Sequence, residues 1–278
     1  MAIIGVGGKI GSGKDTVGAI IQYLVFRDVY KDEIFSTEGE KNFNIYQNSL
    51  KPLDSTFKIK KFADYLKDIV CGLINCTREQ LEDPVFKDTE LGEEWTKYSY
   101  ADGFWSHSDN NPSHKRMDSI QCTRAKYIEE HSTNWQTAYK TVYTPRILLQ
   151  QIGTELFRNQ LLNDIWVNAL MSKYLPIENS MRASMGNVID YSDCIYPNWI
   201  ITDVRFPNEL QAVKNRRGIS IRVNRGRTGG EILEDKNSEH PSETSLDAAT
   251  FDYVIHNDDS IEELIERVRE ILIKEKII

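Results

Sequence analysis

The chain has 278 residues, a formal net charge of −8 and 27% charged residues. Its length is sufficient for one large α/β core with an insertion. The acidic balance argues against a broad surface for polymeric nucleic acid, because such binding would require a local basic patch. No stretch approaches the roughly 18 consecutive apolar residues that a membrane-spanning helix requires, so we expect no membrane insertion.

Short apolar runs along the chain predict buried strands at Ile3 to Gly7, Phe57 to Phe62, Trp199 to Thr202, Ile219 to Asn224 and Tyr253 to His256. Helical patterns predict helices over Thr16 to Phe26, Ala63 to Leu73, Pro145 to Leu162, Pro207 to Asn215 and Ser260 to Lys274. In the last of these, Ser260 is expected to cap the helix together with Glu263. Strands that alternate with helices predict a mostly parallel sheet with helices on both faces.

Two polar stretches interrupt this pattern. Residues 93–143 are rich in Trp, Tyr, His, Ser, Asn and Asp and are interpreted as an insertion or a lid-like excursion. Residues 225–249 contain three glycines and one proline and lie between the fourth and fifth predicted strands. Functional loops are often found in irregular segments of this kind.

The segment Gly8-Lys9-Ile10-Gly11-Ser12-Gly13-Lys14 follows the first strand and precedes the first helix. A strand, a glycine-rich turn and a helix in this order are typical of a phosphate-binding loop. The glycines let several N–H groups point into one concavity, and Lys14 adds a full positive charge for the β- and γ-phosphates. The next residue is Asp15, where the usual pattern has a Ser or Thr hydroxyl that contacts magnesium. Nucleoside triphosphate binding is the resulting hypothesis.

Asp203 and Arg205 follow the third predicted strand. An acidic residue at the carboxyl end of such a strand lies beside the phosphate loop in this class of fold, where it can hold magnesium through water or orient a nucleophile. Alternatively, Asp203 is only the cap of the helix that begins near Pro207.

The predicted helix at 145–162 carries polar residues at helical spacing, namely Arg146, Gln150, Gly153, Thr154 and Arg158. Two arginines and an amide on one face suit a phosphate and a base edge, although a solvated amphipathic helix has the same pattern. Arg225 and Arg227 follow the fourth strand, where arginines on a closing loop can neutralise a phosphoryl group in transfer. The segment Glu239 to Thr244 is interpreted as a loop entering a helix, with Ser242 or a neighbour as its N-cap.

Taken together, these segments resemble the bacteriophage-type deoxynucleoside monophosphate kinases. The resemblance rests on the segments Gly8 to Thr16, Lys61 to Lys67, Thr144 to Glu155, Ile201 to Glu209 and His240 to Thr244. Asp15, which is unusual for a generic phosphate loop, matches that family's pattern. The matching segments are spread over nearly the whole chain except residues 93–143.

The resemblance implies an α/β P-loop kinase fold of the adenylate-kinase type. We expect a five-stranded parallel sheet flanked by helices, with a helical monophosphate-binding insertion and a lid. The chain would form a single domain, 1–278, with core segments 1–75 and 195–278. The monophosphate-binding region would span 62–175, including the extra insertion 93–143, and the lid would span 225–250. We expect the insertion either to gate the monophosphate site or to mediate formation of a homodimer.

The resemblance also implies ATP and Mg²⁺ as cofactors and a deoxynucleoside 5′-monophosphate as the acceptor. The expected ATP-binding residues are Gly11, Ser12, Gly13, Lys14, Asp15, Thr16, Arg225 and Arg227. The expected acceptor-binding residues are Ala63, Asp64, Lys67, Arg146, Gln150, Thr154, Arg158, Trp166, Arg205 and Glu209. The expected catalytic residues are Lys14, Asp15, Asp203, Arg205 and Arg225, and Asp15 and Asp203 are the candidates for magnesium.

The expected reaction is transfer of the γ-phosphoryl group of ATP to the monophosphate, which needs alignment and charge neutralisation but no strong base. A kinase for another phosphorylated acceptor, of the dephospho-coenzyme A or phosphomevalonate type, would use the same loop. A nucleotide-binding switch or ATPase would use it as well, but such a protein needs no second anion site. The four cysteines lack paired C-x-x-C spacing and no secretion signal is evident, so we expect a cytoplasmic protein, in the host cytoplasm if the gene belongs to a phage.

Overall fold

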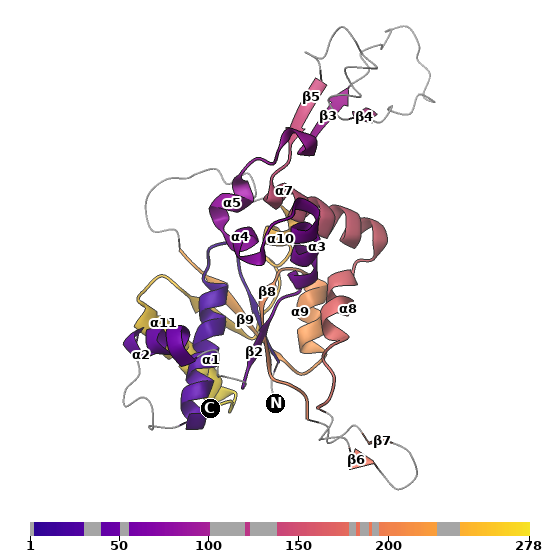
Figure 1. Ribbon diagram of the computed structural model, residues 1–278. Helices are drawn as coiled ribbons and strands as arrows, with labels where there is room; N and C mark the ends of the chain where they lie inside the picture. Colours follow the sequence, from indigo (N-terminus) through magenta and orange to yellow (C-terminus); the bar gives the residue numbers. More distant parts are fainter. Residues whose placement is uncertain are drawn as a thin grey trace. The chain divides into compact units, whose positions relative to one another are not determined.

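The computed structural model describes residues 3–30, 40–50, 56–100, 120–122, 138–177, 182–183, 189–190, 195–226 and 240–278. The chain forms two compact units (Figure 1). The first unit consists of Met1–Tyr65 and Leu162–Ile278, and the second of Leu66–Leu161.

The first unit contains a five-stranded sheet in the order β10-β9-β1-β8-β2. Its strands are β1 (Ile3–Gly7), β2 (Lys58–Lys60), β8 (Trp199–Val204), β9 (Ile219–Asn224) and β10 (Tyr253–His256). Every neighbouring pair is parallel, with β1 between β8 and β9. The predicted α/β class with a five-stranded parallel sheet is therefore confirmed. The carboxyl ends of all five strands lie at one edge.

Helices cover both faces of this sheet (Figure 1). One face carries α1 (Lys14–Tyr30) and α11 (Ile261–Lys274), and the other carries α8 (Ile165–Met171) and α9 (Pro207–Lys214). The unit also contains α2 (Glu40–Ile45), the π-helical turn η1 (Tyr46–Leu50), α10 (Pro241–Thr244), and the strand pair β6 (Arg182–Ala183) and β7 (Ile189–Asp190). As predicted, Ser260 caps α11, since its side chain accepts from the N–H of Glu263.

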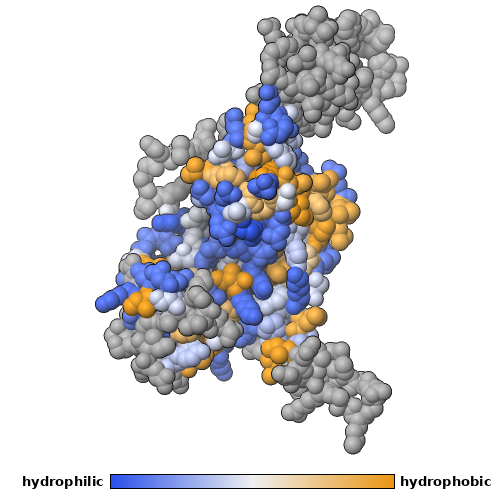
Figure 2. Space-filling view, viewed as in Figure 1, coloured by the Kyte–Doolittle hydropathy of each residue, from blue (hydrophilic) through white to orange (hydrophobic). Residues whose placement is uncertain are grey.

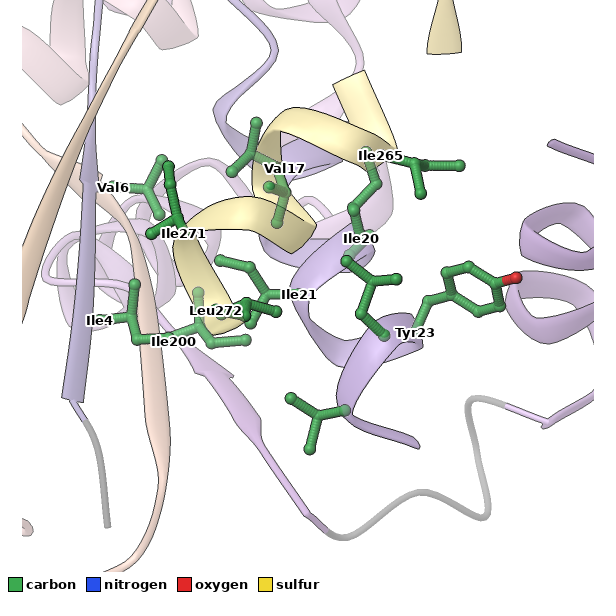
Figure 3. Close-up of a cluster of buried hydrophobic side chains, with 14 of the residues drawn as sticks. Ile4, Val6, Val17, Ile20, Ile21, Tyr23, Ile200, Ile265, Ile271 and Leu272 are labelled. Atoms are coloured by element: carbon green, nitrogen blue, oxygen red, sulfur yellow. The ribbon is translucent and has the colours of Figure 1, made fainter. Parts of the chain in front are cut away.

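A hydrophobic core lies between β1, α1 and α11 (Figure 3). Ile4 of β1, Ile20 of α1, and Ile265 and Leu272 of α11 are each at most 1% exposed. Burying a side chain of this size stabilises the fold by about 1.5–3 kcal/mol. The core therefore fixes α1 against the sheet and, with it, the loop that enters α1.

The second unit contains most of α3 (Asp64–Ile74), followed by α4 (Arg78–Glu82), α5 (Pro84–Asp88), the 3₁₀ turn η3 (Glu93–Trp95) and the helices α7 (Pro145–Gln150) and η5 (Gln151–Leu161). An antiparallel sheet in the order β4-β3-β5 joins β3 (Thr96–Tyr100), β4 (Ile120–Cys122) and β5 (Ala138–Val142). Exposed leucines, among them Leu156 and Leu161, give the surface over η5 a hydrophobic patch (Figure 2).

The helix predicted over 145–162 changes its hydrogen bonding part-way along. It begins as the α-helix α7 and continues from Gln151 as the π-helix η5. The α-helical spacing predicted for this face is therefore wrong beyond Gln150, because π-helical bonds run from residue i to i+5. Gly153 lies in this part, at a point where an added Cβ would be 2.5 Å from a methyl carbon of Leu66.

Other boundaries differ from the predicted ones by a few residues. The strand predicted at 57–62 is shorter, because the chain has already turned by Phe62, whose N–H donates to the carboxylate of Asp203. The helix predicted at 16–26 extends over Lys14–Tyr30. Residues 227–239 of the predicted lid, and residues 101–119 and 123–137 of the insertion, lie outside the described residues. Among the described residues, none of the helices combines the length and apolar character that crossing a bilayer requires.

Two helical glycines provide a test of the packing of α1 on β8. A Cβ added to Gly18 would lie 2.5 Å from Cγ2 of Thr202, whereas a Cβ added to Gly72 on α3 meets no atom of the described residues within 4 Å. We expect Gly18→Ala to lower the free energy of unfolding by about 1–3 kcal/mol through overpacking. The matched control Gly72→Ala should raise it by up to about 1 kcal/mol through helix propensity. Urea unfolding of both variants checks this, and equal effects would contradict the close packing.

Candidate active site

The loop between β1 and α1 has the shape of a phosphate-binding loop. Gly8 and Gly13 have φ angles of 152° and 96°, which glycine adopts readily. A Cβ at Gly8 would lie 2.4 Å from the carbonyl oxygen of Val223, and one at Gly13 would lie 2.4 Å from the side-chain nitrogen of Asn257. Asn257, which follows β10, donates to the carbonyl oxygen of Ser12 at 2.9 Å. Residues of β9 and of the segment after β10 thus approach the loop closely.

The hydroxyl of Ser12 indicates that this loop is suited to binding a ligand. Ser12 is 3% exposed, and among the described residues its Oγ has no hydrogen-bond partner. A buried hydroxyl without a partner costs about 1–3 kcal/mol. A phosphate oxygen would supply the missing acceptor, so the loop fits the phosphate chain of a nucleotide.

Lys14 is the charged centre of the loop. It is 8% exposed, and its Nζ donates to the carbonyl oxygen of Lys9 at 2.6 Å. Burial, assisted by the positive charge of Arg205, lowers the pKa of Lys14 to about 8. Three carboxylates act on that pKa in the opposite direction, namely Glu243, Asp15 and Asp203. The ammonium group is therefore poorly solvated and suited to receive an anion.

Asp15 connects three elements of the first unit. Its Oδ1 accepts a hydrogen bond of 2.7 Å from the hydroxyl of Thr202 on β8. The same oxygen lies 3.0 Å from Nζ of Lys61, which follows β2. The first turn of α1 is thus linked to β8 and to the β2–α3 turn through one carboxylate.

Asp203, at the end of β8, accepts two backbone hydrogen bonds. The N–H of Phe62 donates to its Oδ1 at 2.8 Å, and the N–H of Ala63 donates to its Oδ2 at 2.9 Å. Asp203 is therefore not the cap of α9, whose N-cap residue is Phe206. Its carboxylate instead fixes the β2–α3 turn, where Asp64 accepts from the N–H of Lys61 at 3.2 Å.

Arg205 is held at its backbone and at its guanidinium. Oε2 of Glu209, which is 3% exposed, accepts from the N–H of Arg205 at 2.8 Å and from the N–H of Phe206 at 3.1 Å. The guanidinium donates from Nη1 to Oε1 of Glu243. The carboxylate of Glu209 thus caps α9.

Trp166, on α8, is 5% exposed and belongs to the interior of the first unit.

Two of the predicted acceptor-binding cations form ion pairs in the second unit. Arg146 binds Asp88 through two hydrogen bonds, Nε to Oδ1 at 2.5 Å and Nη2 to Oδ2 at 2.9 Å. These bonds hold the pKa of Asp88 below its usual range. Lys67 donates to Oε1 of Glu82 at 2.5 Å. Both pairs are of the kind that fixes a long basic side chain in one orientation.

The remaining predicted residues are distributed as follows. Thr154 and Arg158 on η5 are 8% and 5% exposed, so they are not solvated positions of an amphipathic helix. Gln150 at the end of α7 is partly buried. Thr16 in α1 is partly exposed and Arg225 after β9 is exposed, whereas Arg227 lies outside the described residues.

Several residues of this site were absent from the predicted set, namely Lys61, Thr202, Glu243 and Asn257. Thr202 adjoins the predicted residue Asp203, Lys61 lies two positions before the predicted residue Ala63, and Glu243 lies in the segment interpreted as a helix start. For these three residues, closeness to a predicted residue or segment was the signal that the sequence offered. Asn257 is a single amide after a strand, and no pattern marks it.

The chain was compared with protein families and curated proteins. A model of the family described as deoxynucleotide monophosphate kinase matches residues 99–268, more than half of the chain. The chain belongs to this family. A relative from Acanthamoeba polyphaga mimivirus, named "Putative deoxynucleotide monophosphate kinase", is 29% identical over 136 residues. The match covers 45% of this chain and 59% of the viral protein, so the chain spans less than two thirds of that relative's length.

The carboxylates of the site allow a test of the magnesium that the family implies. Among the described residues, no group of three or more His, Cys, Asp or Glu side chains could hold a metal ion. Mg²⁺ in sites that bind nucleotide phosphates commonly takes one or two carboxylates, with phosphate oxygens and waters as its other ligands. Asp15, whose side chain is 70% exposed, fits that role better than Asp203, since both oxygens of Asp203 accept backbone N–H groups.

Replacing Lys14 tests whether its burial costs stability. At pH 7 the folded protein carries a desolvated ammonium, so we expect Lys14→Met to be more stable than the original protein, by on the order of 3 kcal/mol at about 1.4 kcal/mol per pKa unit. Between pH 8 and the unfolded value of 10.5, the unfolded chain binds more protons at Lys14. The original protein therefore gains stability in that range and the advantage of the variant shrinks.

The measurement is urea unfolding of both proteins at pH 7 and pH 9.5 without nucleotide. The matched control is Lys9→Met, which makes the same substitution at an exposed position of the same loop. An advantage of Lys14→Met that stays constant or grows with pH would contradict the buried charge.

Proposed function

We propose that the protein transfers the γ-phosphoryl group of ATP to the 5′-phosphate of a deoxynucleoside monophosphate, giving the diphosphate and ADP. The observation that carries this proposal is the buried Lys14 in a glycine-rich loop, with Arg205 and Lys61 held nearby by carboxylates. The family match supports the monophosphate as acceptor.

On the donor side, we propose that Gly11, Ser12, Gly13, Lys14 and Thr16 bind the phosphates of ATP, with Arg225 and Arg227 contributing after β9. The loop offers backbone N–H groups at the start of α1, where the helix dipole also favours negative charge. The hydroxyl of Ser12 supplies one donor and the ammonium of Lys14 supplies the charge. Mg²⁺, when bound, would neutralise further phosphate charge, with Asp15 or Asp203 as its carboxylate partner.

On the acceptor side, we propose the residues that the resemblance implies, namely Ala63, Asp64, Lys67, Arg146, Gln150, Thr154, Arg158, Trp166, Arg205 and Glu209. The cations would bind the monophosphate, and Gln150 would bind a base edge. Asp64 and Glu209 act through the backbone, since Asp64 accepts the N–H of Lys61 and Glu209 accepts that of Arg205.

Lys61 is an addition to this acceptor set. Its Nζ lies 3.0 Å from Asp15, at the first turn of α1, so its charge is held beside the phosphate loop. A cation in this place can bind the oxygens of the attacking phosphate. The ion pair therefore supports a role for Asp15 in orienting Lys61, the cation that would bind the acceptor.

The chemistry requires little proton transfer. The attacking phosphate oxygen is already anionic, so no general base is needed. The chain's task is to align the two phosphates and to neutralise their charge with Lys14, Arg205 and Lys61. Bound phosphate stabilises the protonated form of Lys14, which counters the effect of burial on its pKa.

We also propose that the protein works in a reducing, cytoplasmic setting on small nucleotides, not on polymeric nucleic acid. The four cysteines lack paired C-x-x-C spacing, which supports a reducing setting. The net charge of −8 argues against a polymeric nucleic acid as the ligand.

A coupled assay that measures ADP release tests the proposed reaction. With ATP, Mg²⁺ and each deoxynucleoside monophosphate in turn, including dTMP and dGMP, at least one should be phosphorylated much faster than ATP is hydrolysed. Lys14→Ala should lower kcat by at least about a hundredfold with the fold intact, because the charge on the moving phosphoryl group loses its main partner.

The proposal fails if no monophosphate raises ADP release above the rate with water. Thermal stabilisation by pantetheine compounds or by mevalonate phosphate, but not by nucleotides, would indicate a kinase for another acceptor.

Lys61→Met tests the acceptor role of Lys61. We expect KM for the monophosphate to rise about tenfold or more, with KM for ATP changed by less than about twofold, because one cation of the acceptor site is lost. Lys58→Met, at an exposed position of β2, is the matched control. A rise in KM for ATP alone would assign Lys61 to the donor side instead.

A further inference from the structure

Glu243 is a residue of the site that the proposed reaction has not used. It lies on α10, in the segment His240 to Thr244, and its side chain is 8% exposed. Oε2 accepts the N–H of Ile10 in the phosphate loop at 2.7 Å. Oε1 accepts from Nη1 of Arg205, beyond the end of β8. One buried carboxylate thus joins two loops that leave neighbouring strands.

The segment that carries Glu243 is fastened on its other side. Leu246 is 7% exposed, and its carbonyl oxygen accepts from Nη1 of Arg222 on β9. Asp247 pairs with Arg222 at 2.9 Å and with Lys9 of the phosphate loop at 3.3 Å. Contacts with β9 and with the phosphate loop therefore fix the position of the segment that carries Glu243.

Arg205 needs such a partner to be held in one orientation. Its side chain has many rotamers, and the carboxylate of Glu209 fixes only its backbone N–H. The bond to Glu243 fixes the guanidinium as well. Since a guanidinium has five N–H donors, others remain for a phosphate.

We propose that Glu243 is a positioning residue that holds the guanidinium of Arg205 against the phosphate loop, in the orientation that the transferred phosphoryl group requires. The proposal rests on the proposed function, because it assigns Arg205 to the phosphoryl group in transfer. Its substrate is the same nucleotide pair, and no further ligand is needed. Glu243 itself touches no reacting atom.

The two oxygens of Glu243 can be separated by mutation. In Glu243→Gln, the amide oxygen can still accept the N–H of Ile10, but the amide nitrogen is a donor and cannot accept from Arg205. In Glu243→Ala both bonds are lost. Glu270→Gln on α11, at an exposed position, makes the same change of charge and serves as the control.

The test is a double-mutant cycle between Glu243→Gln and Arg205→Ala, read as kcat and KM. We expect Glu243→Gln to lower kcat by about tenfold to a hundredfold, with KM for ATP changed by less than about twofold. In the Arg205→Ala background, the same substitution should lower kcat by no more than about twofold, because it acts through Arg205. Glu270→Gln should leave kcat unchanged.

Equal losses from Glu243→Gln in both backgrounds would overturn the proposal, as would a normal kcat in Glu243→Gln alone. A second readout does not depend on activity: Glu243→Ala should speed amide hydrogen exchange at Ile10, whereas Glu243→Gln should leave it protected. Fast exchange in both variants would also overturn the assignment of the two oxygens. If the original protein phosphorylates no monophosphate, it is the proposed function that fails, and the exchange measurement still tests the bond between Glu243 and Ile10.

Discussion

The site depends on the parallel pairing of β1 with β8 on one side and β9 on the other. Because the five strands run in one direction, the chain leaves each of them at the same edge of the sheet. The phosphate loop follows β1, Arg205 follows β8 and Asn257 follows β10. Lys61 follows the edge strand β2. Residues far apart in the sequence thus lie together without any local motif that joins them.

Within this arrangement, the carboxylates act mainly as acceptors that fix other groups. Asp203 binds two backbone N–H groups of the β2–α3 turn, and Glu209 binds two at the start of α9. Asp15 and Glu243 each bind one cation and one further donor. The three buried carboxylates among them, Asp203, Glu209 and Glu243, are stable only when hydrogen-bonded in this way. Lys14, by contrast, has a pKa that burial and the charge of Arg205 depress, so a poorly solvated ammonium is the group that the phosphates would meet.

The sequence predicted those strands and helices that the pattern of apolar residues marks. The strands at 3–7, 219–224 and 253–256 have their predicted bounds, because apolar residues flanked by turn residues mark strands, but the edge strand β10 is only partly buried, against the prediction. The change to π-helical bonding after Gln150 was not predicted, since apolar spacing does not report which backbone groups pair. Nor was the bond between Ile10 and Glu243, whose residues are 233 positions apart. Contacts between polar loops follow from the topology of the sheet and leave no pattern in either segment.

Asp15 shows how one substitution in a common loop changes what the loop can hold. A Ser or Thr hydroxyl in this place would offer a neutral oxygen, whereas the carboxylate brings a full negative charge to the first turn of α1. That turn tolerates the charge, since the helix dipole is positive at its N-terminus. The charge in turn holds the ammonium of Lys61 at 3.0 Å, while the same oxygen of Asp15 also accepts a hydrogen bond from the hydroxyl of Thr202. In the proposed reaction, α1 would therefore carry both the end of the donor's loop and the carboxylate that orients Lys61 for the acceptor, so that one side chain would link the positions of the two phosphates.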